Sequence, residues 1–167
     1  MNEYKDLKLT VASSPHINSP VNTRRLMLDV LIACIPIVAM GVVFFGPRAL
    51  RLGAVSVAGC EVFEWLYRKL MKKSTANGDL SAAITGVLLS FVCPVSIPYW
   101  TILVGDFFAI VVVKQLFGGL GKNFLNPALA GRAFLLLSCL QLMGKWVKPG
   151  YHNWWSITGS IDRKSVV

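Results

Sequence analysis

Charged residues are scarce in this sequence of 167 residues. They make up 15% of the chain, against about 25% in an ordinary soluble domain, whereas apolar residues make up 54%. The charges are missing in blocks, because several windows of about 20 residues, the length that a helix needs to cross a bilayer, hold two charges or fewer. A disordered chain is excluded, since it would be poor in apolar residues. The composition predicts a helical membrane protein.

Cysteine and histidine are also few, and each shortage excludes a class of protein. The four cysteines, Cys34, Cys60, Cys93 and Cys139, are too few for a disulfide scaffold. None stands in the C-x-x-C spacing of zinc or cluster sites, so we expect buried free thiols and no metal site. Two histidines are too few for a haem-carrying bundle, and nothing resembles a Ser-His-Asp or Cys-His nucleophile.

Acidic residues number 8 against 17 lysines and arginines, which gives a net charge of +9. This excess does not predict nucleic-acid binding. The basic residues lie at the edges of apolar blocks, where membrane proteins place them, and no basic stripe with interleaved aromatic residues is present.

Five apolar segments follow a polar N-terminal tail, residues 1–25, which lacks the apolar core of a signal peptide. We expect spans at residues 26–45, 49–67, 80–95, 100–117 and 124–144, and a second polar tail at 145–167. Backbone groups in lipid must pair within their own segment, so these spans should be helices. The predicted fold is an all-α, polytopic bundle over 26–144, with a turn rich in Gly and Asn before the fifth helix.

The distribution of lysine and arginine predicts the orientation, because cytoplasmic loops carry the excess. One side holds nine basic residues: Lys5, Lys8, Arg24, Arg25, Arg68, Lys69, Lys72, Lys73 and Lys122. The other side holds Arg48 and Arg51, to which the C-terminal tail adds Lys145, Lys148, Arg163 and Lys164. We therefore expect a cytoplasmic N-terminus and an external C-terminal tail.

Ionisable residues inside the spans are candidates for function, because placing them there is costly. Glu61 and Glu64 are three positions apart on one helical face, so they either pair with basic neighbours such as Arg68 or line a cation path. Asp106 and Arg132 lie deeper, and each needs a partner in another helix or a polar ligand.

The segment from Gly118 to Asn126 has two interpretations. Its glycines favour a tight turn between helices. Its amides, Asn123 and Asn126, offer donors and acceptors beside an open backbone, which suits a flat ligand with a polar edge. Irregular backbone at membrane depth is tolerated where protein or a cavity encloses it.

Here the sequence resembles a known family, which includes the D subunit of the Rnf electron-transport complex and the B subunit of the sodium-pumping NADH:quinone oxidoreductase. Four pieces carry the resemblance: Ser14-Pro15-His16 with the stretch from Thr23 to Asp29; Phe45-Gly46-Pro47; the stretch from Asp79 to Gly86; and Phe117 to Ala128, which is long and specific. Together they extend over most of residues 9–140.

The resemblance implies an integral flavoprotein of a bacterial or archaeal cytoplasmic membrane, which contacts lipid and the other membrane and peripheral subunits of an Rnf-type complex. Such complexes pass electrons between ferredoxin and NAD and couple this transfer to Na⁺ or H⁺ transport. The family implies a non-covalent riboflavin near Gly119, Gly121, Asn123, Asn126 and Arg132. It also implies FMN, attached to a threonine in a Ser-x-Ala-Thr motif.

That motif is absent from this sequence. The segment that precedes it in the family matches Ile161-Asp162, but Arg163-Lys-Ser-Val-Val167 follows. We therefore expect no covalent FMN on any of its six threonines. The family has about twice as many spans, so the chain resembles an N-terminal part, which we expect not to be catalytic alone. The alternative function is half of a non-redox channel or secondary transporter, with broken helices around Pro94–Pro98 and Gly118–Asn123.

Overall fold

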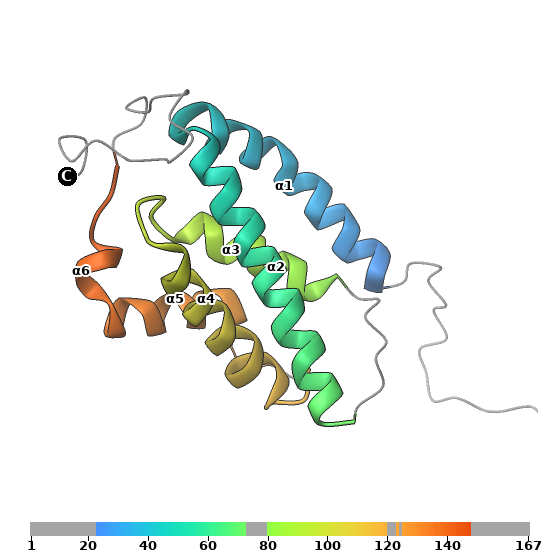
Figure 1. Cartoon of the computed structure of the whole chain (residues 1–167). Coiled ribbons are helices and arrows are strands. Elements are labelled where there is room, and N and C mark those ends of the chain that lie inside the picture. Colours follow the sequence, from blue (N-terminus) through green and yellow to red (C-terminus); the bar gives the residue numbers. More distant parts are fainter. Residues whose placement is uncertain (1–22, 73–79, 120–122, 124, 148–167) are drawn as a thin grey trace, which may run out of the picture.

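The computed structural model describes residues 23–72, 80–119, 123 and 125–147, and in these ranges it contains helices and turns but no β-strand (Figure 1). The elements are α1 (Thr23–Phe45), α2 (Pro47–Leu70), α3 (Ser81–Val92), α4 (Tyr99–Phe107), the π-helix η1 (Phe108–Gln115), α5 (Pro127–Ser138) and α6 (Leu140–Met143). Since η1 continues α4 without a break, the two form one rod. The predicted all-α fold is confirmed.

Helices α1 and α2 form an antiparallel hairpin around a single glycine (Figure 1). Gly46 has a φ of 75°, which favours glycine, and its N–H donates to the carbonyl of Val42 at 2.9 Å. Pro47 opens α2, where its fixed φ suits a first helical position. The break therefore falls at the predicted Gly46-Pro47, whereas α1 continues through Pro36.

An arginine side chain fixes the turn between α3 and α4. Cys93 is extended because it precedes Pro94, and a proline disfavours helical backbone at the residue before it. Arg48, at the start of α2, donates to the carbonyl of Val95 at 2.9 Å and to those of Ser96 and Ile97 at 3.3 Å. One guanidinium thus binds three consecutive carbonyls of the turn that follows α3.

The helices connect two polar ends of the molecule. The Arg48 end comprises the Gly46-Pro47 turn, the 93–98 turn and Lys145, whose carbonyl accepts from Ser96 Oγ. The Glu64 end comprises the last turns of α2 and η1, the first turn of α3 and the turn before α5. Successive elements run between these ends in alternating directions, so that α1, α3 and α5–α6 lie antiparallel to α2 and α4–η1.

The predicted spans each contain a helix, but two of these helices are short. Helices α3 and α5 have 12 residues each, about 18 Å of helix, and α5 ends where Cys139 leaves helical geometry. Among the described helices, α1 alone is both long and apolar enough to cross a membrane by length and composition. The number of crossings therefore stays a prediction.

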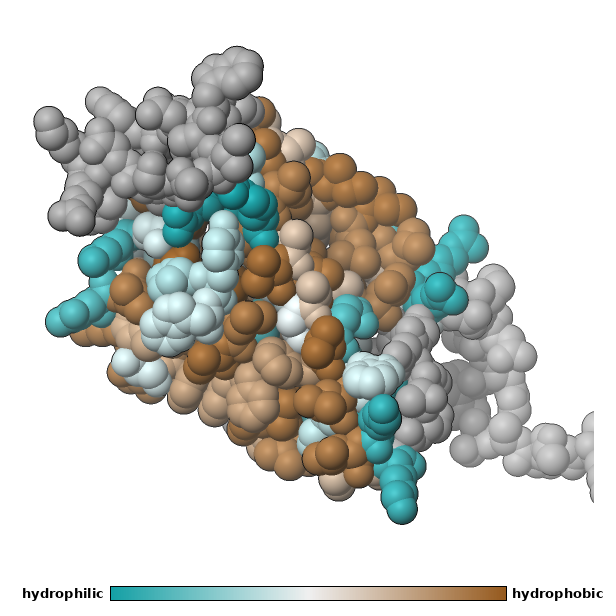
Figure 2. Space-filling model, viewed as in Figure 1, coloured by the Kyte–Doolittle hydropathy of each residue, from teal (hydrophilic) through white to brown (hydrophobic). Residues whose placement is uncertain are grey.

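The outer surface is apolar between the two ends. Figure 2 shows hydrophobic side chains across the middle of the visible face and hydrophilic ones gathered toward its ends. Helix α1 is the most exposed element, and Cys34 is its one buried residue. Exposed apolar area of this extent is not stable in water, whereas lipid would solvate it.

Glycines let the helices approach closely. A Cβ at Gly86 of α3 would lie 2.7 Å from Val57 Cα and 2.9 Å from the carbonyl oxygen of Ser56, both in the backbone of α2. A Cβ at Gly131 of α5 would lie 3.0 Å from the carbonyl oxygen of Gly105. Small residues at such positions are typical of helix packing in membranes.

The contact at Gly86 gives a stability prediction. The substitution Gly86→Ala should push α3 away from α2, because backbone atoms cannot yield as a side chain can, and should lower the free energy of unfolding by about 1–3 kcal/mol. The matched control is Gly41→Ala in α1, where an added Cβ meets nothing within 4 Å. Thermal unfolding followed by circular dichroism measures both. Equal stability of the two variants would contradict the close α2–α3 contact.

Candidate functional site

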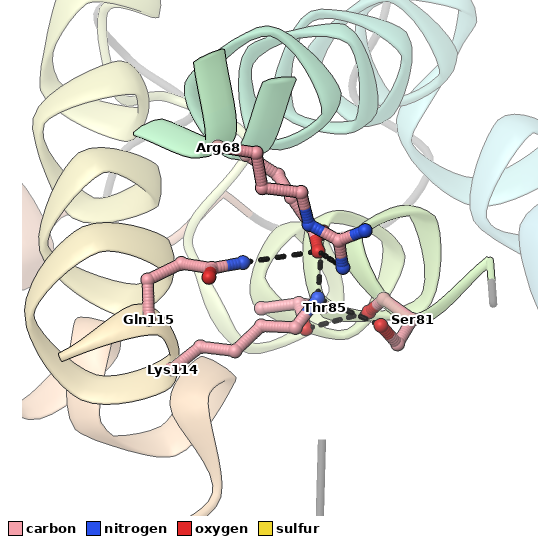
Figure 3. A network of polar contacts seen from close by, with 6 residues as sticks. Arg68, Ser81, Thr85, Lys114 and Gln115 are labelled. Atoms are coloured by element: carbon pink, nitrogen blue, oxygen red, sulfur yellow. Dashed lines mark hydrogen bonds and ion pairs between the residues drawn. The ribbon is translucent and has the colours of Figure 1, made fainter. Parts of the chain in front are cut away.

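A buried cluster of charged and polar side chains lies at the Glu64 end (Figure 3). The carboxylate of Glu64 accepts from Lys114 Nζ at 2.7 Å, from Arg68 at 2.5 Å and from Gln115 Nε2 at 3.0 Å. Lys114 Nζ also donates to Ser81 Oγ at 2.7 Å. The carboxylate therefore joins α2 to η1, and Lys114 extends the cluster to α3.

The sequence of α2 places Glu64 in the interior. Leu52, Ser56, Cys60 and Glu64 follow one another at intervals of four residues, and all four are buried. A four-residue interval keeps side chains on one face of a helix. Three of these four buried residues are polar, and this face of α2 contacts α3 and the rod formed by α4 and η1.

The π-helix η1 brings two adjacent polar side chains to this face. Val113, Lys114 and Gln115 are all buried, although consecutive residues of an α-helix point about 100° apart. A π-helix has more residues per turn, so consecutive side chains point in more similar directions. Such segments are frequent at functional sites. Lys114 is 1% exposed and Glu64 is 6% exposed, so water screens their attraction little.

The prediction that Glu64 pairs with Arg68 is confirmed, because the two side chains form an ion pair within α2. Glu61 lies beside this pair on the same face, as predicted. Both glutamates line a recess of about 10 Å³ with Arg68 and Ser81, which is room for about one water molecule. Glu61 forms no hydrogen bond or ion pair with another described residue.

The turn before α5 is attached to the same cluster through the backbone of Lys114. Gly118 and Gly119 have φ values of 102° and 90°, and the N–H of Gly119 donates to the carbonyl of Lys114 at 2.9 Å. With its amide nitrogen facing these carbonyls, Asn123 donates to Gly119 at 3.0 Å and to Lys114 at 3.2 Å. Gly121 lies outside the described residues.

Asn126 and Arg132 occupy different parts of α5. Asn126 caps the helix, because its Oδ1 accepts from the N–H of Ala128 at 3.1 Å, and its side chain is exposed. Arg132 lies six positions further on, about 9 Å along the axis. Its Nε is buried and forms no hydrogen bond with any described residue. The two asparagines thus have structural roles, and the structure does not bring Arg132 against them.

Asp106 lies in α4, between the two polar ends, and is fully buried. As predicted, its partners come from another helix: Ser56 Oγ lies 2.7 Å from its Oδ1, and Cys60 Sγ lies 3.2 Å from the same oxygen. All four cysteines are free, as predicted, and Cys139 is the one that is not fully buried.

The sequence did not predict the roles of Lys114, Gln115, Ser81 or Ser56. A signal for Lys114 was present, since a lysine inside an apolar span needs an acidic partner and Glu64 is an acidic residue inside another span. No comparable signal exists for Ser56 and Ser81, because serines inside membrane helices are common at helix contacts without charged partners.

These features define a helical membrane protein with a polar interior, and comparison with known sequences gives its family. The NQR2, RnfD, RnfE family matches residues 10–165. The chain is 50% identical over 133 residues to the D subunit of the Na⁺-translocating ferredoxin:NAD⁺ oxidoreductase complex of Acetobacterium woodii, a match that covers 80% of this chain and 42% of that protein. It is 38% identical over 159 residues to the D subunit of the ion-translocating oxidoreductase complex of Escherichia coli K12, over 94% of this chain and 45% of that protein.

This protein therefore belongs to the NQR2, RnfD, RnfE family. It spans about half the length of the curated relatives that it matches. The resemblance seen in its motifs is confirmed.

The buried cluster gives a prediction for single and paired substitutions. Glu64→Gln should leave Lys114 buried without an anion and should lower the free energy of unfolding by about 3–5 kcal/mol, because this charge stays uncompensated. Lys114→Met should cost less, because Arg68 still pairs with the Glu64 carboxylate. The double variant should lose less than the sum of the two.

Lys69→Met is the matched control, since Lys69 is exposed on α2 and lies over the Trp65 ring at 4.7 Å. Its loss should cost about 0.5–1 kcal/mol. Chemical unfolding in micelles measures all four variants. Strictly additive losses at positions 64 and 114 would show that the two side chains do not interact.

Proposed function

We propose that this chain is the N-terminal part of a membrane subunit in an electron-transport complex that couples ferredoxin:NAD electron transfer to Na⁺ or H⁺ translocation. The observation that carries this proposal is the family match over residues 10–165. The names of the two relatives, an Na⁺-translocating ferredoxin:NAD⁺ oxidoreductase and an ion-translocating oxidoreductase, supply the reaction. Other subunits of such a complex are then its partners, and the chain alone is not the catalyst.

In this proposal the buried acidic residues serve ion movement. Glu64 lies in the interior at one end, with Glu61 beside it in a small recess, and Asp106 lies between the two ends. Charged groups at the centre of a membrane helix cost about 2.5–3.5 kcal/mol on insertion scales, and they mark ion and proton pathways. At Glu64, the ion pair with Lys114 offsets the cost of burying the charge. Asp106 has no such cation among the described residues.

The flavin sites are the second part of the proposal. Gly119, Gly121, Asn123, Asn126 and Arg132 would contact a non-covalent riboflavin, whose isoalloxazine ring carries the electrons while the protein orients the ring and tunes its potential. Two features of the described residues fit such a ligand. The Nδ2 group of Asn126 is not needed for capping, and Arg132 has a buried N–H without a partner among them. Covalent FMN needs an acceptor motif that this sequence lacks.

A channel or transporter half is the second candidate. The 12-residue helix α3 and the extended segment at Cys93, followed by Pro94 and Pro98, favour it, because discontinuous helices form substrate sites in many transporters. Flavin absorbance of the purified protein separates the two candidates.

We also propose that all five predicted spans cross a bacterial or archaeal cytoplasmic membrane, with the N-terminus in the cytoplasm. The alternating helix directions support this arrangement. On α2, Arg48 and Glu64 are 16 positions apart, about 24 Å along the axis, which approaches the ~30 Å of a hydrocarbon core. The Glu64 end carries Arg24, Arg25, Arg68, Lys69 and Lys72, and it would face the cytoplasm.

Labelling of single cysteines tests this topology. Thr23→Cys and Met71→Cys should react with an impermeant maleimide from the cytoplasmic side, and Lys145→Cys, directly after the fifth span, should react from the outside. These substitutions are made in a variant without the four native cysteines, and all three positions are exposed. Labelling of positions 71 and 145 from the same side would contradict an odd number of crossings between them.

Flavin content tests the second part of the proposal. In a complex assembled with its partner subunits, Asn123→Leu or Asn126→Leu should weaken riboflavin binding by about 5–150-fold, since an unpaired buried polar group costs about 1–3 kcal/mol. Asn126→Asp is the matched control for folding, because a carboxylate keeps the cap of α5 while removing the amide donors. If riboflavin content is normal in Asn126→Asp and both leucine variants, the stretch is only a turn between helices.

A further inference from the structure

Asp106 is buried without an ionic partner. Its exposed fraction is 0%. Oδ1 contacts Ser56 and Cys60 of α2, whereas Oδ2 forms no hydrogen bond with any described residue. Oδ2 faces Gly59, where an added Cβ would lie 3.2 Å from it. A carboxylate in this position would carry a charge that nothing around it compensates.

The depth of Asp106 follows from its contact with Ser56. Ser56 is eight positions from Arg48 and eight from Glu64 on the same helix, so it lies about 12 Å from each of them. Asp106 is therefore midway between the two polar ends, where water and snorkelling side chains are furthest away.

The charged groups of the neighbouring elements either bind another residue or lie too far from Asp106 to balance its charge. On α2, Glu64 lies two turns from Ser56, and Glu61 and Cys60 add no positive charge. On η1, Lys114 is bound to Glu64 at 2.7 Å. Helix α3 carries no charged residue, and Arg132 of α5 forms no ion pair with Asp106. The negative charge thus requires a bound cation.

The hydrogen bonds of Ser56 indicate where that cation is held. Its hydroxyl oxygen lies 2.7 Å from Asp106 Oδ1 and 3.0 Å from the carbonyl oxygen of Gly86. A hydroxyl has one hydrogen, so it can donate to only one of these two acceptors. A proton on Asp106 Oδ1 satisfies both contacts, because Asp106 then donates to Ser56, and Ser56 donates to Gly86.

We propose that Asp106, Ser56 and the Gly86 carbonyl form a buried site for one exchangeable monovalent cation, which is a proton in this arrangement. The same oxygens are ligands of the kind that hard cations take, so Na⁺ is the other possible occupant. When the proton leaves, the Ser56 hydroxyl turns from the Gly86 carbonyl to Asp106, and the carboxylate keeps a buried charge that no described residue balances. This cost favours exchange of one cation for another over an empty site. The inference rests on the proposed function and locates its ion site.

Infrared spectroscopy of the full chain in lipid vesicles tests this site. In Na⁺-free potassium buffer near neutral pH, the chain should show the C=O stretching band of a protonated carboxylic acid. The band should shift in D₂O and should be lost completely in Asp106→Asn. Glu61→Gln, which removes a different carboxyl group from a neighbouring turn of α2, is the matched control and should leave the band unchanged.

Two further measurements keep the result unambiguous. Asp106→Asn should unfold at nearly the same temperature as the parent, because an amide can also donate to Ser56. If that variant does not fold, Ser56→Ala serves instead, and it should shift the band by removing its hydrogen-bond acceptor. Adding Na⁺ at constant pH should abolish the band if Na⁺ exchanges with the proton, and should leave it if the site takes protons alone.

Absence of a band that depends on Asp106, at every pH tested in Na⁺-free buffer, would overturn the proposal. The measurement uses no flavin and no electron donor. A negative result would therefore reject the cation site and leave the flavin proposal intact, whereas failure to bind flavin would not affect the band.

Discussion

The ion pair between Glu64 and Lys114 is the contact on which the rest of the structure depends. It joins α2 to η1 in the interior, and Lys114 extends the link to Ser81 at the start of α3. Both side chains are nearly fully buried, so neither can find water if the other moves. Replacing such a pair by apolar residues can be neutral in stability, but removing one member is costly. The pair therefore specifies one relative position of the three helices.

The same lysine connects this interior to the turn before α5. Its side chain binds Glu64, and its carbonyl accepts from Gly119 and from the amide of Asn123. A displacement of η1 that breaks the ion pair would also displace the turn, because both contacts belong to one residue. In the proposed function, this residue is the direct structural link between the acidic side chains and the turn assigned to flavin. Energetic coupling between sites needs such a chain of physical contacts.

Much of the fold could be predicted from the sequence, because apolar blocks and their breakers are local signals. The break at Gly46-Pro47, the pairing of Glu64 with Arg68 and the free cysteines were all predicted correctly. The shortness of α3 and α5 was not, since apolar residues continue beyond the last helical turn in both. The partner of Glu64 across helices was also missed, because Lys114 is 50 positions away and only packing brings the two together. Asn123 and Asn126 offered two interpretations, and both side chains contact backbone groups. The groups left over for a ligand are the oxygen of Asn123, whose two amide hydrogens are used, and the amide nitrogen of Asn126.

The three polar layers of α2, at Arg48, Ser56 and Glu64, differ in how their charge is balanced. At the Arg48 end, a cation meets backbone carbonyls, which carry only partial charge. At the Glu64 end, one carboxylate meets two cations and an amide. At Ser56, midway between them, one carboxyl group meets a hydroxyl and a thiol. In the outer layers the chain itself supplies the balancing groups, which are three carbonyls around Arg48 and two cations around Glu64. The middle layer has no such help, so it is the layer whose charge has to be balanced by a cation that the chain itself does not supply.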